Sequence, residues 1–156
     1  MISLPRILLE ELRGKAGERG PSVEEFLADV ITLGLDPEDR AKKYIDVALE
    51  LLEQAREELE RNDLRQASEK IWGSCALAIK AYAFWREKRH LESHSELWKY
   101  KSRVARELGG WVRDVWMYAN SMHRNFYEGE ADREDVEKSL RLVERLVKTV
   151  VERVRG

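Results

Sequence analysis

The chain has 156 residues, of which 43% are apolar and 37% are charged. This length and composition suit one globular domain with its own core and leave little room for a second large domain. Lys and Arg number 28 against 30 Asp and Glu, so the net charge of −2 gives no global attraction to nucleic acid or to a membrane. Any such binding has to come from a local patch.

The sequence contains no stretch of about 18 consecutive apolar residues that could span a membrane, and it begins without the apolar run of a signal peptide. Cys75 is the single cysteine and only three histidines occur, so neither a disulfide nor a cysteine-based metal site can form within the chain. We expect a soluble cytoplasmic protein that uses no metal or other cofactor. Its dense charge and its scarcity of Asn and Gln are typical of a thermophilic source.

Two short helices are predicted within the N-terminal 35 residues. The first begins at Pro5, whose missing N–H costs nothing in a first turn, and Gly17 and Gly20 mark its end. For the second, Ser22 forms a capping box with the glutamate three residues on, and Gly34 suits the left-handed conformation that closes a helix. We expect this segment, residues 1–35, to be a two-helix extension of the main domain.

Longer helices are predicted for the rest of the chain, residues 36–156. Apolar residues recur at spacings of three and four, and no segment alternates with period two for long enough to indicate a strand. Small residues in the run GSCALAIKA allow close approach of a neighbour, so the second of these helices should be central. The fold class is therefore all-α, an antiparallel helical bundle. Its expected helices span about 37–61, 64–86, 94–108 and 111–126, and a last helix follows the cap Asp132 and includes Val154.

One stretch, residues 84–126, is basic, with nine basic against five acidic side chains. It also contains all three histidines and four of the five tryptophans. If the protein contacts a phosphate backbone, Lys99, Lys101 and Arg103 are the expected contacts. The alternative is an ordinary solvated helix face.

The most unusual segment is Asn120–Gly129. On a helix Trp116, Asn120, His123 and Tyr127 share one face, where a neutral histidine could act as a general acid or base. The same residues could instead form a polar seam against the last helix.

Three segments stand out along the chain: QASEKIWGSCALAIKAYA (66–83), HSELW (94–98) and SMHRNFYEG (121–129). In this order they resemble the PaREP proteins of thermophilic archaea, a branch of the HEPN superfamily of nucleotide-binding domains. The resemblance covers about residues 38–155. It implies a bundle of about five helices, often paired into a dimer, and the active HEPN ribonucleases share an arginine and a following histidine that are separated by four to six intervening residues.

The histidine of that motif corresponds to His123, and Asn120 to a polar position within it. The positions required for the arginine hold Trp116, Met117 and Tyr118, and Arg113 lies ten residues before His123. A second pair, Arg89 and His94, meets the spacing but straddles the loop after the central helix. We therefore favour binding without catalysis, with Asn120, Arg124, Asn125 and Tyr127 as further ligand contacts.

The first 35 residues are also similar to ribbon-helix-helix proteins, which pair short strands in a dimer and read the major groove of DNA. Only Met1–Leu4 precede the first helix, and Ser3 is the one polar residue there. A strand this short and neutral suits dimerisation or packing better than reading DNA.

The residue patterns and the resemblance together predict a HEPN-like protein that binds a nucleotide, RNA or a partner protein. One half of a toxin–antitoxin or nucleotidyltransferase-associated pair is the role that such a protein would have. The alternatives are a metal-independent ribonuclease that uses His123 and a DNA-binding regulator that uses the N-terminal helices. A homodimer is expected because Trp98, Trp111 and Trp116 exceed what one small bundle needs to bury, with the sixth helix in or near the interface.

Overall fold

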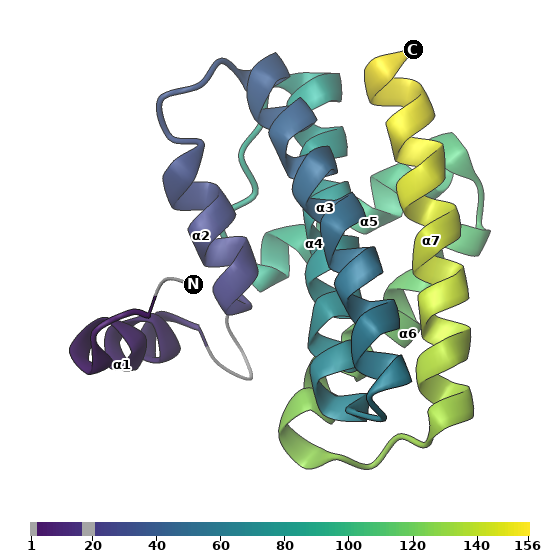
Figure 1. Ribbon diagram of the computed structural model, residues 1–156. Coiled ribbons are helices and arrows are strands. Elements are labelled where there is room, and N and C mark those ends of the chain that lie inside the picture. The colour runs from purple at the N-terminus through teal and green to yellow at the C-terminus, as the bar shows by residue number, and fades with distance from the viewer. Residues whose placement is uncertain (1–2, 17–20) are drawn as a thin grey trace.

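The computed structural model describes residues 3–16 and 21–156, and all the regular structure within these ranges is helical (Figure 1). This confirms the predicted all-α class. The seven helices in these ranges are α1 (Arg6–Lys15), α2 (Val23–Ile31), α3 (Pro37–Glu60), α4 (Leu64–Glu87), α5 (His94–Leu108), α6 (Trp111–Glu128) and α7 (Arg133–Arg155).

The centre of the bundle is α4, as the sequence predicts. It packs against α3, α5, α6 and α7, and its residues from Ile71 to Phe84 are all buried. At Gly73 an added Cβ would lie 3.2 Å from Leu51 Cδ1 of α3, and Ser74 Oγ donates a hydrogen bond of 2.8 Å to the Ala48 carbonyl. Small side chains therefore bring the long helices α3 and α4 together.

Side-chain caps begin four of the helices, at starts that agree with the predicted ranges. Ser22 caps α2 in a full capping box, Asp63 caps α4, Ser93 caps α5 and Asp132 caps α7. Each side-chain oxygen accepts from a backbone N–H that has no partner within its own helix. The predicted boundaries in this part of the chain are thus confirmed to within a few residues.

Helix ends were predicted less well. Gly34 was expected to close α2 in a left-handed conformation, but among the described residues the glycines with positive φ are Gly109 and Gly129. The cap of α2 is instead Thr32, whose hydroxyl donates to the Ala28 carbonyl at 2.7 Å. A side-chain hydrogen bond thus does what the glycine was expected to do. The predicted end of the first helix, at Gly17 and Gly20, lies outside the described residues.

A buried ionic network attaches α2 to the bundle. Lys80 Nζ of α4 lies 3.0 Å from Asp29 Oδ2 and 3.3 Å from Glu25 Oε1, both on α2. Tyr44 of α3 also donates to Asp29, and Arg40 donates to Tyr44 and to Thr32. Burial by itself lowers the pKa of Lys80, but the two carboxylates raise it above its ordinary value. Lys80 is therefore held as a cation between two anions.

None of the helices in the described ranges is long and apolar enough to cross a bilayer. Across the same residues, no group of three or more His, Cys, Asp or Glu side chains is placed to hold a metal ion. Cys75 is buried in α4, and burial raises the pKa of its thiol.

Candidate functional site

The Glu69 carboxyl of α4 lies within hydrogen-bonding distance of the His123 imidazole of α6. Glu69 Oε1 lies 2.8 Å from His123 Nδ1, and both residues are buried. Desolvation raises the pKa of the Glu69 carboxyl, and the hydrogen bond with His123 opposes this effect. A carboxyl group held on one ring nitrogen fixes the orientation of the imidazole, the arrangement in which histidine works as a proton acceptor or donor.

The imidazole of His123 belongs to a column of aromatic rings. It stacks on Trp72 of α4, with ring centroids 5.2 Å apart, and meets the edge of Tyr127 at 5.7 Å. Trp72 in turn contacts Trp116 at 5.3 Å and His94 at 5.4 Å. Ring packing of this kind holds His123 in one rotamer. The predicted common face of Trp116, His123 and Tyr127 is thus present, but it packs against α4 rather than against the last helix.

Trp116 was expected among the exposed aromatic residues, and this was wrong. It is fully buried, because the side chains of Trp72, His94 and Trp98 surround it within one chain. Trp98 is exposed to 38%, while Trp111 is half-buried under the guanidinium of Arg145, 4.0 Å from its ring centroid. Of the three tryptophans cited for a dimer, only Trp98 is substantially exposed.

A cavity of about 500 Å³ opens beside the Glu69–His123 pair. It lies between α1, α2, α4 and α6, and its volume is in the range of small-molecule sites. Phe126 and Tyr127 form part of its wall, together with Gln66 and Glu69, while Arg13 of α1 adds a positive charge. The wall also includes Glu24, whose carboxylate is paired with Lys70 at 2.6 Å. It therefore combines aromatic residues and hydrogen-bonding groups with one cation and two carboxyl groups.

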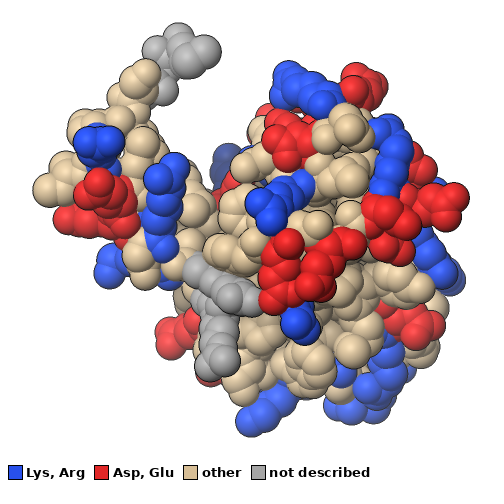
Figure 2. Space-filling view, turned by 90° about the horizontal axis from the view of Figure 1, so that it is seen from below, with Lys and Arg blue, Asp and Glu red and all other residues tan. Residues whose placement is uncertain are grey.

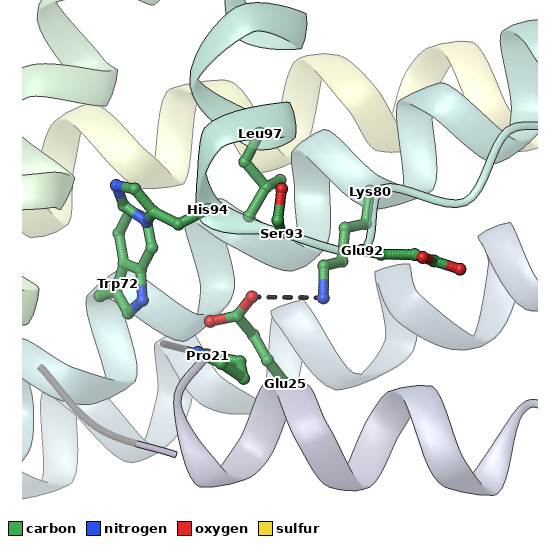
Figure 3. Close-up of a pocket in the computed structure, with 8 residues that line it drawn as sticks. All are labelled: Pro21, Glu25, Trp72, Lys80, Glu92, Ser93, His94 and Leu97. Atoms are coloured by element: carbon green, nitrogen blue, oxygen red, sulfur yellow. Dashed lines mark ion pairs between the residues drawn. The ribbon is translucent and has the colours of Figure 1, made fainter. Parts of the chain in front are cut away.

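A second cavity, of about 10 Å³, lies where α2 meets α4 and the start of α5 (Figure 3). Glu25 and Lys80 face each other across it, and Trp72 and His94 close one end. Burial lowers the pKa of His94, which favours the neutral ring. A space of this size accommodates one water molecule at most. This cavity is therefore part of the junction of α2 with the bundle, and the larger one is the candidate site.

The other predicted contacts near His123 occupy different positions. Asn120 is half-buried, and Asn125 is buried, where its Nδ2 donates to Ser68 Oγ at 2.9 Å and its Oδ1 accepts from the Ala131 N–H at 2.7 Å. These bonds give Asn125 a structural role in holding the α6–α7 turn. Arg124 is exposed, with Nε 2.9 Å from Glu128 Oε2 one turn on. Neither Asn125 nor Arg124 lines the cavity beside Glu69.

The predicted basic patch on α5 is less open than the sequence indicates. Lys99 is exposed, but Lys101 is buried, with its ammonium 5.2 Å from the Trp98 ring centroid. Arg103 forms ion pairs with Glu87 and Glu107. Figure 2 shows the face seen from below, where positive and negative side chains alternate over the surface. Of the three basic residues predicted to contact RNA, Lys99 is the one that is both exposed and on this helix's open face.

The sequence analysis missed Glu69 and Trp72 as members of the site. Both lie in the segment QASEKIWGSC, three residues apart, and so share a face of α4. The signal that could have revealed them is a carboxylate on an otherwise apolar helix face, since a buried charge needs a partner. Which partner it has depends on α6, 54 residues away.

Residues 43–147 match the archaeal PaREP1/PaREP8 family. The match contains α4, α5 and α6 complete, and with them Glu69, Trp72, His94 and His123. It leaves out α1 and α2, which complete the cavity. No curated protein and no solved structure matches the chain significantly.

Proposed function

The chain belongs to the archaeal PaREP1/PaREP8 family, and from this premise we propose that it is a HEPN-like protein that binds a nucleotide, or one base of an RNA, without cleaving it. The observation that supports this most directly is the cavity of about 500 Å³ next to the Glu69–His123 pair. Its wall offers the three kinds of group that recognise a nucleotide: ring faces, hydrogen-bonding groups and a cation.

Each part of a nucleotide has a counterpart in the cavity. A base stacks on Phe126 and Tyr127, since every base has a π-face, and such stacking contributes about 1–3 kcal/mol. The Gln66 amide can both donate to and accept from a base edge, and the Glu69 carboxyl adds a further polar contact. Arg13 is the group placed to contact a phosphate.

Binding without cleavage is supported by the way His123 is held. Its Nδ1 contacts Glu69, its ring face is covered by Trp72, and it is exposed to only 3%. A general acid has to reach the leaving oxygen, and a second group has to stabilise the charge that develops on the phosphate. The positions ahead of His123 where HEPN ribonucleases have that arginine hold Trp116, Met117 and Tyr118.

Calorimetric titration with AMP, GMP, CMP, UMP and a single-stranded RNA of ten nucleotides tests the proposal. We expect saturable binding of at least one of them. Gln66→Ala and Arg13→Ala should each weaken binding at least fivefold, because each removes one polar contact worth about 1 kcal/mol or more. The matched controls are Gln54→Ala on α3 and Arg6→Ala on α1, both exposed and outside the cavity. Absence of binding at millimolar nucleotide would contradict the proposal.

The ribonuclease alternative rests on one observation, the carboxylate–imidazole contact between Glu69 and His123. The same contact orients the histidine in many acid–base sites. An assay with fluorescent RNA in the presence of EDTA distinguishes the two functions. Rapid cleavage that is lost in His123→Ala would favour the ribonuclease, and Arg113 of a second copy would then be the first arginine to test.

We extend the proposal to a partner protein of nucleotidyltransferase or antitoxin type. Such a partner would use the nucleotide or RNA that this chain holds. Co-purification of a tagged full-length chain with a nucleotidyltransferase, followed by loss of that association in Arg13→Ala or Gln66→Ala, would connect the partner to the cavity.

A further inference from the structure

The amphipathicity of α2 is inverted with respect to the bundle. The side of α2 that faces α3 and α4 presents Glu25, Asp29 and the cap residue Thr32, all bonded to Lys80, Tyr44 or Arg40. In a helix that packs on a core, this side is ordinarily the apolar one. The apolar stripe of α2 therefore points away from the bundle.

The outward stripe is open to solvent. Val30, Ile31 and Leu33 are exposed to 47%, 72% and 68%. No residue of α1 is buried, and its Ile7 and Leu8 are exposed to 64% and 45%. Among the described residues, nine of the twelve exposed large apolar side chains lie between Leu4 and Leu35. The remaining three are scattered over α5 and α6, so exposed apolar surface is concentrated at the N-terminal helices.

The helix α1 extends this surface instead of covering it. It packs on α2 at the side away from the rest of the bundle (Figure 1). Between the two helices lies an apolar groove of about 280 Å³, lined among others by Leu8, Leu12, Phe26 and Leu27. The groove and the outward stripe form one surface, which we call the α1–α2 apolar face and which comprises the exposed apolar residues between Leu4 and Leu35.

The size of the α1–α2 apolar face matches one half of a dimer interface. Full burial of a Leu or Ile side chain removes on the order of 100 Å² of apolar surface from water. Nine side chains at about half exposure therefore amount to at most roughly 500 Å², since Ile7 and Leu9 point to different sides of α1. A stable interface buries about 800 Å² on each partner, of which about 60% is apolar, again roughly 500 Å². The face is also as large as the biggest patches of typical monomers, which are often functional.

The charges around this face argue against a lipid surface as its occupant. Helices that lie on membranes have a polar face rich in Lys and Arg. The described residues up to Leu35 include three basic and five acidic side chains, and α2 has no basic residue. An anionic bilayer would repel this segment, whereas an apolar face of a second protein would not.

We propose that the α1–α2 apolar face is the interface through which two copies of this chain form a symmetric dimer. An isologous interface requires the same patch on both copies, and a patch made of leucine, isoleucine and valine is complementary to itself. This proposal concerns surfaces outside the nucleotide cavity and is independent of the proposed function. It moves the interface from α6, where the tryptophans suggested it, to the N-terminal helices.

Sedimentation velocity of the full chain tests the proposal. The protein concentration should cover roughly 1 to 100 μM, the range in which standard-size interfaces associate. The wild type should sediment with twice the 18.3 kDa mass of one chain. Ile31→Lys and Ile7→Lys should each weaken dimerisation at least tenfold, because each inserts a charge into the interface. Both side chains are exposed in the monomer, so circular dichroism and the melting temperature of the monomeric fraction should not change.

The matched control is Met117→Lys on α6, where the methionine is exposed to 53%. This variant should dimerise like the wild type. Three results would overturn the proposal: a wild type that stays monomeric at 100 μM, a dimer that is broken by Met117→Lys and not by Ile31→Lys, or a monomer that binds vesicles of phosphatidylcholine and phosphatidylserine. If the face bound only a different protein, the wild type would stay monomeric at that protein concentration, which is the first of these results.

Discussion

Glu69 Oε1 and His123 Nδ1 are 2.8 Å apart at the point where the central helix α4 meets α6. Both side chains are more than nine-tenths buried, and the Trp72 ring covers the imidazole. The contact therefore has two consequences that can be measured separately, one on stability and one on the chemistry of the cavity beside it.

The first prediction is that His123→Ala destabilises the fold by about 1–3 kcal/mol, since it leaves a buried carboxyl group without this partner. Urea denaturation followed by circular dichroism measures the change. His123→Asn, which can still donate a hydrogen bond, should lose less. The alanine variant should cost no nuclease activity, because we expect the wild type to have little to lose. Equal stability of all three proteins would contradict the structural role.

The second prediction concerns pH. Burial raises the pKa of Glu69 above its ordinary value of 4.5, so the native state keeps this proton at pH values where the unfolded chain has lost it. The contribution of this group to stability is therefore fully present below pH 4.5 and is lost as pH rises through the folded pKa. Glu69→Gln should lack this decline. We expect the unfolding free energies of wild type and variant to diverge with pH when they are measured from about pH 4 to about pH 8. Parallel curves would show that the pKa shift is absent.

Third, Lys80→Met should destabilise the protein by about 3–5 kcal/mol, because it leaves the buried Glu25 and the half-buried Asp29 near each other without their cation. Thermal unfolding measures this loss, and α2 should become susceptible to limited proteolysis first. Lys70→Met is the matched control. Lys70 pairs with Glu24 at 2.6 Å in a partly exposed position, so its loss should cost about 1 kcal/mol or less.

Fourth, Gly129→Ala and Gly34→Ala should have opposite effects. Gly129 caps α6 at φ 66°, and an added Cβ there would collide with the Arg65 side chain, so this variant should lose about 1 kcal/mol or more. Gly34 has no neighbour within 4 Å of an added Cβ and no positive φ. Its substitution should be neutral or stabilising by up to about 1 kcal/mol. The melting temperatures of both variants measure these effects, and equal shifts in the two variants would contradict the prediction.

The fifth prediction is that RNA, if it binds, uses the open part of the basic stretch. Lys99→Glu should weaken binding of single-stranded RNA and reduce the dependence of log K on log salt by about 0.7 for one lost phosphate contact. Arg141→Glu on α7 is the control, also exposed but outside this stretch. Arg103 is already paired with Glu87 and Glu107, so its reversal should act mainly through stability. Equal loss of affinity from Lys99→Glu and Arg141→Glu would place RNA elsewhere.

Local signals in the residue pattern were sufficient to identify the helices. The caps Ser22, Asp63, Ser93 and Asp132 act within three residues of their own positions, and the apolar periodicity of α4 depends on the helix alone. Such interactions are present wherever the segment folds, so they can be recognised without knowledge of the rest of the molecule. The helix predicted over residues 111–126 likewise includes His123, and the structure has it on α6.

Only the folded chain decided which surfaces meet. Trp116 and Trp98 both lie on predicted amphipathic helices, yet one is fully buried and the other is exposed, because burial depends on helices that are distant in sequence. The partner of His123 lies 54 residues away, and α2 turns its charged side inward because Lys80 is buried opposite it. An amphipathic pattern specifies that a helix has two faces, and the energy of burying a charge against its partner decides which of them faces the bundle.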